Sequence, residues 1–83
     1  MKHRLLYKPA AQRALGRMDR SEAERIIRSL EAFATTGLGD VKALKGALKG
    51  RYRLRVGKWR VFFGLDQPGS IVLSDIDNRG QAY

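Results

Sequence analysis

The stretch from residue 51 to residue 63 alternates apolar and basic side chains on both sides of a central Gly57-Lys pair. Alternation with a period of two is typical of β-strands with one buried face, and a glycine followed by one other residue suits the two-residue turn of a β-hairpin. Such a turn fixes the register. The predicted pairs of the apolar face are Tyr52 with Phe63, Leu54 with Val61, and Val56 with Trp59. The stretch therefore predicts a two-stranded ribbon with one face turned to a core.

The other face of this ribbon is basic on both strands. The residues predicted on it are Arg51, Arg53, Arg55, Arg60 and Phe62. The same register sets Arg55 directly opposite Arg60, and like charges in such positions destabilise a sheet by ~0.2–1 kcal/mol per pair. Since this arrangement does not stabilise the sheet, we expect an anionic ligand on the basic face.

The net charge supports the same expectation. The chain has 17 Lys and Arg against 8 Asp and Glu, a formal net charge of +9, and no acidic residue occurs between residues 41 and 65. A field of this sign attracts polyanions, which indicates RNA, DNA, a ribosomal surface or an acidic protein as partner. The alternative is a basic surface that only confers solubility, but such surfaces usually mix the two signs of charge.

Length and residue usage limit the remaining possibilities. With 83 residues we expect one domain, residues 1–83. The absence of cysteine excludes disulfides, a thiolate nucleophile and cysteine-ligated zinc, and the first residues contain no apolar run long enough for a signal sequence or a membrane span. We therefore expect a cytoplasmic protein without a membrane partner. Asp75 and Asp77 have no histidine or glutamate nearby in the sequence, so we expect no metal site and no cofactor.

The rest of the chain predicts an α+β fold. Apolar residues recur at helical spacing from Pro9 to about residue 18, and again after a cap at Asp19 or a Ser21–Glu24 capping box until Gly37. We expect a first strand at residues 4–7, no regular element at 38–50, the ribbon, a turn at 66–70 and a last strand at 71–76. This order predicts an N-terminal strand and an antiparallel helical hairpin packed on a mainly antiparallel four-stranded sheet, with the basic face left open.

Several residues of this order also occur together in a known family. They are Leu44 and Gly46 before the ribbon, the ribbon sequence at 52–63, Ile76 in the last strand, and a closing Arg79-x-x-x-Tyr83. In these features the chain resembles the RelE/ParE superfamily of bacterial type II toxins over essentially its whole length. The resemblance implies a ribosome-dependent endonuclease that cuts mRNA, or alternatively an inhibitor of DNA gyrase. Either toxin is held inactive by a cognate antitoxin, and operator DNA is bound only through the antitoxin complex.

The resemblance also implies roles for single residues. The family's basic strand residues correspond to Arg53 and Arg55, its phosphate-binding arginine to Arg60, and its C-terminal tyrosine to Tyr83. The expected catalytic residues are Arg55, Arg60, Arg79 and Tyr83, and the expected RNA-binding residues are Lys45, Lys49, Arg51, Arg53, Lys58 and Phe62. The chain departs from the family at Asn78, where a histidine is common, and in having arginines where the first ribbon strand often has lysines.

Metal-free RNA cleavage needs a base for the 2′-hydroxyl and cations for the charge that develops on the phosphate. Arginines suit the second task, because the guanidinium group binds phosphate oxygens bidentately and stays charged. The best candidate for the base is Tyr83, since His3 is distant in sequence and the basic stretch has no carboxylate. A third interpretation is a nucleic-acid or ribosome-binding protein without catalytic activity.

Overall fold

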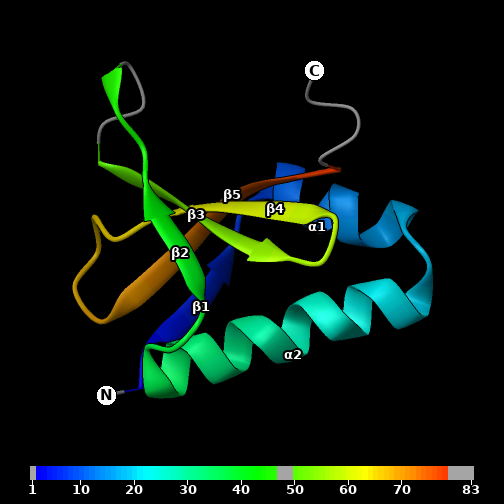
Figure 1. Ribbon diagram of the computed structural model, residues 1–83, viewed down its shortest axis with the longest axis horizontal. Coiled ribbons are helices and arrows are strands. Elements are labelled where there is room, and N and C mark those ends of the chain that lie inside the picture. Colours follow the sequence, from blue (N-terminus) through cyan, green and yellow to red (C-terminus); the bar gives the residue numbers. More distant parts are fainter. Residues whose placement is uncertain (1, 47–49, 79–83) are drawn as a thin grey trace.

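The computed structural model describes residues 2–46 and 50–78, and in it two helices cover one face of a sheet (Figure 1). In chain order the elements are β1 (Arg4–Tyr7), α1 (Pro9–Arg17), α2 (Arg20–Thr36), β2 (Asp40–Ala43), β3 (Arg51–Val56), β4 (Trp59–Gly64) and β5 (Ser70–Asn78). The strands lie in the order β1-β5-β4-β3-β2; β1 is parallel to β5, and the other neighbours are antiparallel. The predicted α+β class with a mainly antiparallel sheet is confirmed.

The sheet has five strands and not the predicted four, because residues 40–43 form an additional strand, β2, at its edge. We expected no regular element there, because residues 38–50 contain three glycines and a repeat-like sequence that is typical of a connector. Pairing with β3 decides the outcome. The chain just before β2 approaches β3 so closely that a Cβ on Gly39 would lie 2.8 Å from Leu54 Cδ1. A glycine at this position therefore lets the segment reach its partner strand.

The two helices occupy the predicted stretches, but the predicted capping box is wrong. Asp19 holds the N-cap position of α2, so Ser21 and Glu24 lie inside the helix, and no side chain forms a capping hydrogen bond. The helix ends at Thr36 and is followed by the C-cap residue Gly37, whose φ of +76° is a left-handed conformation that glycine adopts without strain. Neither helix in the described part of the chain has the length and the apolar run that a membrane crossing needs.

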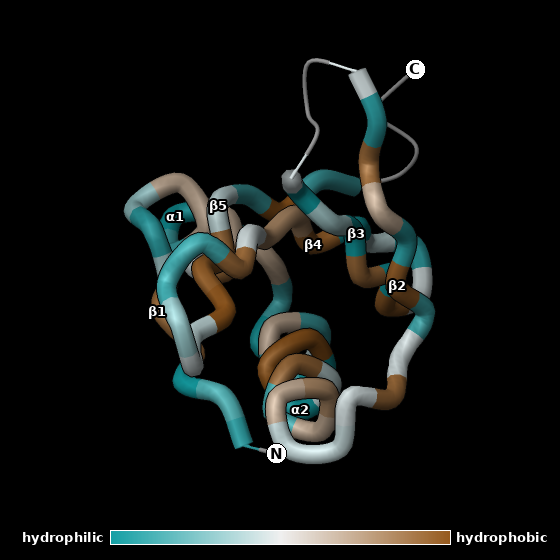
Figure 2. The backbone as a smooth tube through the Cα atoms, turned by 90° about the vertical axis from the view of Figure 1, so that its left-hand side faces the viewer, coloured by the Kyte–Doolittle hydropathy of each residue, from teal (hydrophilic) through white to brown (hydrophobic). Residues whose placement is uncertain are grey.

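The core lies between the helices and the sheet. Its buried members are Ala11, Ile26, Leu30, Ala34, Leu54, Val56, Val61, Phe63, Ile71, Leu73 and Ile76. In it α1 packs against β5, while α2 packs against β1 and β3, and Figure 2 looks along α2 to show this helix on one side of the sheet. Phe63 is fully buried, and its ring centroid lies 5.4 Å from the rings of both Tyr52 and Phe33. Both helices therefore cover the same face and leave the other face open.

The predicted ribbon is formed by β3 and β4 in the predicted register, with Arg55 opposite Arg60. Gly57 begins its turn with φ of +60°, as a Gly-X turn requires. One expectation about the apolar face needs correction, because Trp59 is only half-buried. Its indole Nε1 donates a hydrogen bond of 3.2 Å to Glu22 Oε1, so the ring lies at the margin of the core with its polar end toward α2.

Candidate nucleic-acid interface

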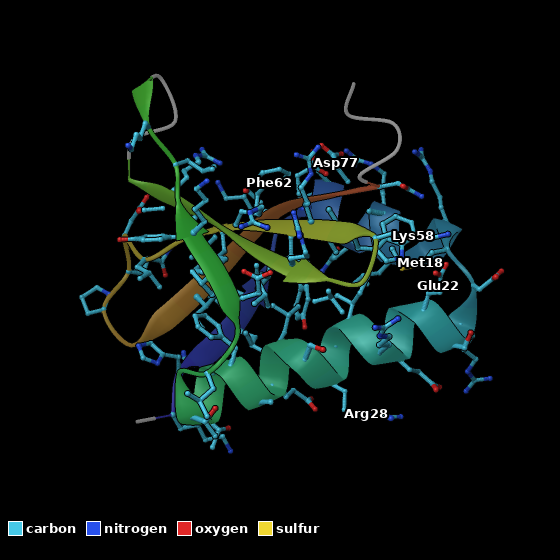
Figure 3. All side chains as sticks on the ribbon, viewed as in Figure 1. Met18, Glu22, Arg28, Lys58, Phe62 and Asp77 are labelled. Atoms are coloured by element: carbon cyan, nitrogen blue, oxygen red, sulfur yellow. The ribbon has the colours of Figure 1, made fainter. Side chains whose placement is uncertain are left out.

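The face of the sheet away from the helices carries two rows of side chains that cross the strands, with basic residues in each row. The first row is Asp40, Arg55, Arg60 and Asp77, and the second is Lys42, Arg53, Phe62 and Asp75, each taken from β2, β3, β4 and β5 in turn. We call the set of Arg51, Arg53, Arg55, Arg60 and Phe62 the arginine face. Figure 3 shows Phe62 and Asp77 on this side of the sheet, and Arg28 on the opposite side, on α2.

The arginines of this face differ in their exposure to solvent. The Arg53 side chain is only 12% exposed, whereas that of Arg55 is 43% exposed. Arg60 is half-buried, and its guanidinium carbon lies 6.0 Å from the centroid of the Phe62 ring, the geometry of a cation–π contact. Phe62 is itself half-buried on the open face and is not part of the core. A phenyl ring held in this way beside guanidinium groups is suited to stacking against a nucleotide base.

The fold also brings carboxylates to the arginine face, which the sequence did not predict. Asp40 lies 3.9 Å from Arg53 Nη2 and 4.0 Å from Arg55 Nε, and Asp77 lies across from Arg60 in the sheet. The protein therefore supplies its own carboxylates, Asp40 and Asp77, at the two ends of the row that contains Arg55 and Arg60. From the sequence we expected the only negative charge there to come from a bound ligand. The alternation of Asp40 and Lys42 is the sequence signal for this arrangement, but it has meaning only once β2 is recognised as a strand.

The other predicted RNA-binding residues do not all belong to the arginine face. Arg51 is exposed at the start of β3, and Lys45 is exposed just after β2. Lys58 turns away from the arginine face, since its Nζ lies 3.6 Å from Glu22 Oε1 and 5.7 Å from the Trp59 ring centroid. Three predicted site residues lie outside the described residues: Lys49, Arg79 and Tyr83. Their roles stay predictions.

Among the residues that the structure describes, no tyrosine or histidine belongs to the arginine face. Tyr52 faces the core, and the backbone N–H of His3 bonds to Ala34 at the end of α2. Tyr7 packs against the core, where burial, and then the nearby Glu31 carboxylate, raise the pKa of its phenol. This phenol therefore stays protonated at neutral pH, and neither Tyr7 nor Tyr52 is placed on the arginine face to act as the base.

Several solved structures share this arrangement of strands and helices, and toxins and toxin–antitoxin complexes are among them. The toxin–antitoxin complex RelBE2 from Mycobacterium tuberculosis matches with a TM-score of 0.83 at 18% identity, over 95% of this chain and 100% of that one. The RelE–RelB complex from Pyrococcus horikoshii matches with 0.75 at 20% identity, over 98% and 99%. The YoeB/ParE toxin from Agrobacterium tumefaciens matches with 0.75 at 18% identity, over 90% and 96%.

The chain has the RelE toxin fold. The likeness lies in the backbone, since no family model and no curated protein sequence matches the chain. In this RelE fold the arginine face is the outer surface of the central strands β3 and β4, which the helices leave uncovered.

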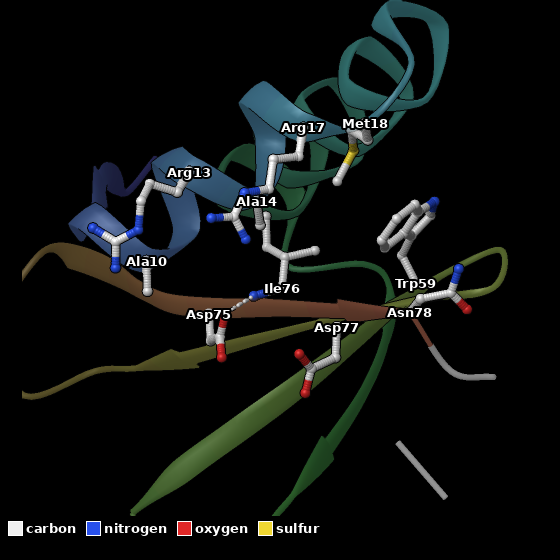
Figure 4. A pocket seen from close by; sticks show the side chains of 10 residues that line it. All are labelled: Ala10, Arg13, Ala14, Arg17, Met18, Trp59, Asp75, Ile76, Asp77 and Asn78. Atoms are coloured by element: carbon white, nitrogen blue, oxygen red, sulfur yellow. Dashed lines mark hydrogen bonds between the residues drawn. The ribbon is translucent and has the colours of Figure 1, made fainter. Parts of the chain in front are cut away.

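The RelE fold of this chain also contains a pocket that the sequence did not predict. Its volume is about 500 Å³. β1 pairs with β5 only as far as Leu73, and beyond that residue α1 lies beside β5 in place of β1. The pocket lies between α1 and this second half of β5 (Figure 4). Its lining residues are Ala10, Arg13, Ala14, Arg17, Met18, Trp59, Asp75, Ile76, Asp77 and Asn78. Arg13 and Arg17 lie one helical turn apart on α1, and both are exposed. Through Asp77 the pocket borders the arginine face.

Proposed function

We propose that this chain is the toxin of a type II toxin–antitoxin system and that it cleaves mRNA on the ribosome without a metal ion. The proposal is supported by the shared fold, since the similar structures include one named as a toxin–antitoxin complex and one named as a toxin. The single observation that supports it most is the pair of Arg55 and Arg60, opposite each other on an uncovered face, with Phe62 in the next row.

In the proposed reaction the 2′-hydroxyl of one nucleotide loses its proton and its oxygen attacks the neighbouring phosphorus. The P–O5′ bond then breaks, so that a cyclic phosphate remains on one fragment and the 5′ oxygen leaves with a proton. Negative charge grows on the phosphate oxygens along this path, and we assign its stabilisation to Arg55 and Arg60. Arg53 and Arg51 bind the phosphates on either side, and Phe62 stacks against a base.

We assign the base to Tyr83 and a further phosphate contact to Arg79. A phenol has an unperturbed pKa near ~10, and cations placed beside a phenol favour its phenolate form. Replacing Tyr83 by phenylalanine should then slow cleavage by roughly 10²-fold or more, the usual contribution of a general base. Affinity for the ribosome should remain, because it depends on the arginines. The measurement is single-turnover cleavage of mRNA on programmed ribosomes, together with ribosome co-sedimentation.

Tyr52→Phe is the matched control, because Tyr52 faces the core and loses the same single hydroxyl group. Equal cleavage rates for wild type and Tyr83→Phe would remove Tyr83 from the mechanism but leave the nuclease in place. If the wild-type protein cuts no mRNA, the nuclease proposal is wrong. Inhibition of DNA supercoiling by gyrase would then favour the alternative, a gyrase-binding toxin, and the absence of both activities would favour a plain RNA-binding protein.

The proposed partner is an acidic antitoxin that covers the arginine face, and operator DNA would be bound only through this complex. A net charge of +9 should steer such a partner to the toxin, so the association should be fast at low ionic strength. Raising the salt concentration from about 0.1 M to about 1 M shortens the Debye length from roughly 10 Å to roughly 3 Å. We expect the association rate constant, measured by stopped flow, to fall roughly 10-fold or more. A rate constant independent of salt would contradict steering by this face.

A further inference from the structure

The carboxylate of Asp40 lies between two guanidinium groups of the arginine face. Its Oδ1 is 3.9 Å from Arg53 Nη2, and its Oδ2 is 4.0 Å from Arg55 Nε, so each oxygen faces a different arginine. An RNA phosphate also presents two charged oxygens and carries one negative charge. Asp40 therefore occupies the position that a phosphate would take between Arg53 and Arg55.

The contact between Asp40 and the two arginines is loose. A charge-assisted hydrogen bond measures about 2.7–2.9 Å, so distances of 3.9 and 4.0 Å give attraction without hydrogen bonding. The Asp40 side chain is 61% exposed and lies on an edge strand of four residues. On the other side of the contact, Arg53 Nη1 is buried and has no hydrogen-bond partner among the described residues. The arrangement leaves hydrogen-bonding capacity on Arg53 that Asp40 does not use.

We propose that Asp40 is an intramolecular competitor for the phosphate position between Arg53 and Arg55, and that single-stranded RNA binds there by displacing it. The inference rests on the proposed function in so far as it takes RNA as the ligand. A tethered carboxylate lowers the affinity of the arginine face for any single phosphate contact. Only an RNA that makes several contacts at once then remains bound. Asp40 therefore weakens nonspecific binding of RNA through a single phosphate contact more than binding through several contacts.

A different role for Asp40 predicts the opposite sign. If its carboxylate mainly holds Arg53 and Arg55 in the right orientation for RNA, then its removal should weaken binding. A competitor, in contrast, strengthens binding when it is removed. Of the other carboxylates on this side of the sheet, Asp75 accepts a hydrogen bond of 2.8 Å from the N–H of Ile76 on its own strand (Figure 4).

The test compares wild type with Asp40→Asn in binding to a uridine decamer over a series of salt concentrations. Glu24→Gln is the matched control, because it removes the same charge from a 54% exposed carboxylate that pairs with Arg20 at 3.4 Å on α2. We expect Asp40→Asn to bind the decamer roughly 5-fold to 10-fold more tightly than wild type. The slope of log K against log salt should steepen by about 0.7, the value for one more phosphate neutralised on a single strand. The affinity of Glu24→Gln for the decamer should remain within about 2-fold of the wild-type value, because the negative charge that it removes lies far from the bound RNA.

Equal affinities of Asp40→Asn and Glu24→Gln would overturn the inference, and so would weaker binding by Asp40→Asn or the failure of all three proteins to bind the decamer at low salt. A thermal melt of each variant shows whether the fold is retained, which we expect for an exposed edge position. The proposed nuclease is tested separately by cleavage on programmed ribosomes. Absence of cleavage with the predicted gain in decamer affinity would reject the nuclease and retain the role of Asp40.

Discussion

Replacing Phe63 by alanine should cost ~3–5 kcal/mol of unfolding free energy, the usual loss for a buried phenyl ring. The ring is 0% exposed, and its centroid lies 5.4 Å from those of Tyr52 and Phe33, so its removal leaves a cavity inside the core. A small domain has only about 5–15 kcal/mol of stability in total. We therefore expect the melting temperature, followed by circular dichroism, to fall by more than roughly 12 °C.

Phe62→Ala is the control for this prediction, because the two phenylalanines are neighbours in β4 and point to opposite faces of the sheet. The change at Phe62 should cost less than ~1.5 kcal/mol in stability, since its ring is only half-buried. It should instead weaken binding to single-stranded RNA by ~1–3 kcal/mol, the range for loss of one stacked base. Equal losses of stability in the two variants would show that the assignment of faces is wrong.

Replacing Arg60 by alanine should lower the rate of mRNA cleavage by roughly 10²-fold to 10³-fold and abolish growth arrest. This is the effect of removing one preorganised group that stabilises charge in a transition state. Arg60 has this role in our proposal because it lies opposite Arg55 and beside Phe62 on the uncovered face. Single-turnover cleavage on programmed ribosomes and growth after induction measure the two effects.

Two further variants show whether the loss at Arg60 is specific. Arg28→Ala removes the same charge from an exposed position on α2, on the opposite side of the molecule, and should leave cleavage unchanged (Figure 3). Arg60→Lys keeps the charge but loses the planar fork of the guanidinium group, so it should recover only part of the rate. Wild-type growth arrest by well-expressed Arg60→Ala protein would reject the assigned role.

The sequence alone determined the ribbon and its register. Alternation with a period of two and a glycine that accepts a positive φ are local signals, and they were sufficient to place Arg55 opposite Arg60 and to separate the faces of Phe62 and Phe63. The order of the helices and the last strand could be predicted for the same reason. The two helices have apolar residues at the spacing of their own period, and the last strand begins with a continuous apolar run, so each could be identified without knowledge of its neighbours.

Only the tertiary structure decided what lies around the arginines. β2 is four residues long and has one inward apolar residue, so its own sequence does not identify it as a strand. It becomes one because it pairs with the edge of β3, and Gly39 allows the close approach. That non-local pairing brings Asp40 to the arginine face. In the same way, α2 supplies the carboxylate of Glu22 that draws Lys58 to the helix side. A local pattern predicts which face of its own strand a side chain lies on. The charged residue opposite that side chain comes from a strand or helix far away in the sequence, and the position of this residue depends on how the whole sheet assembles.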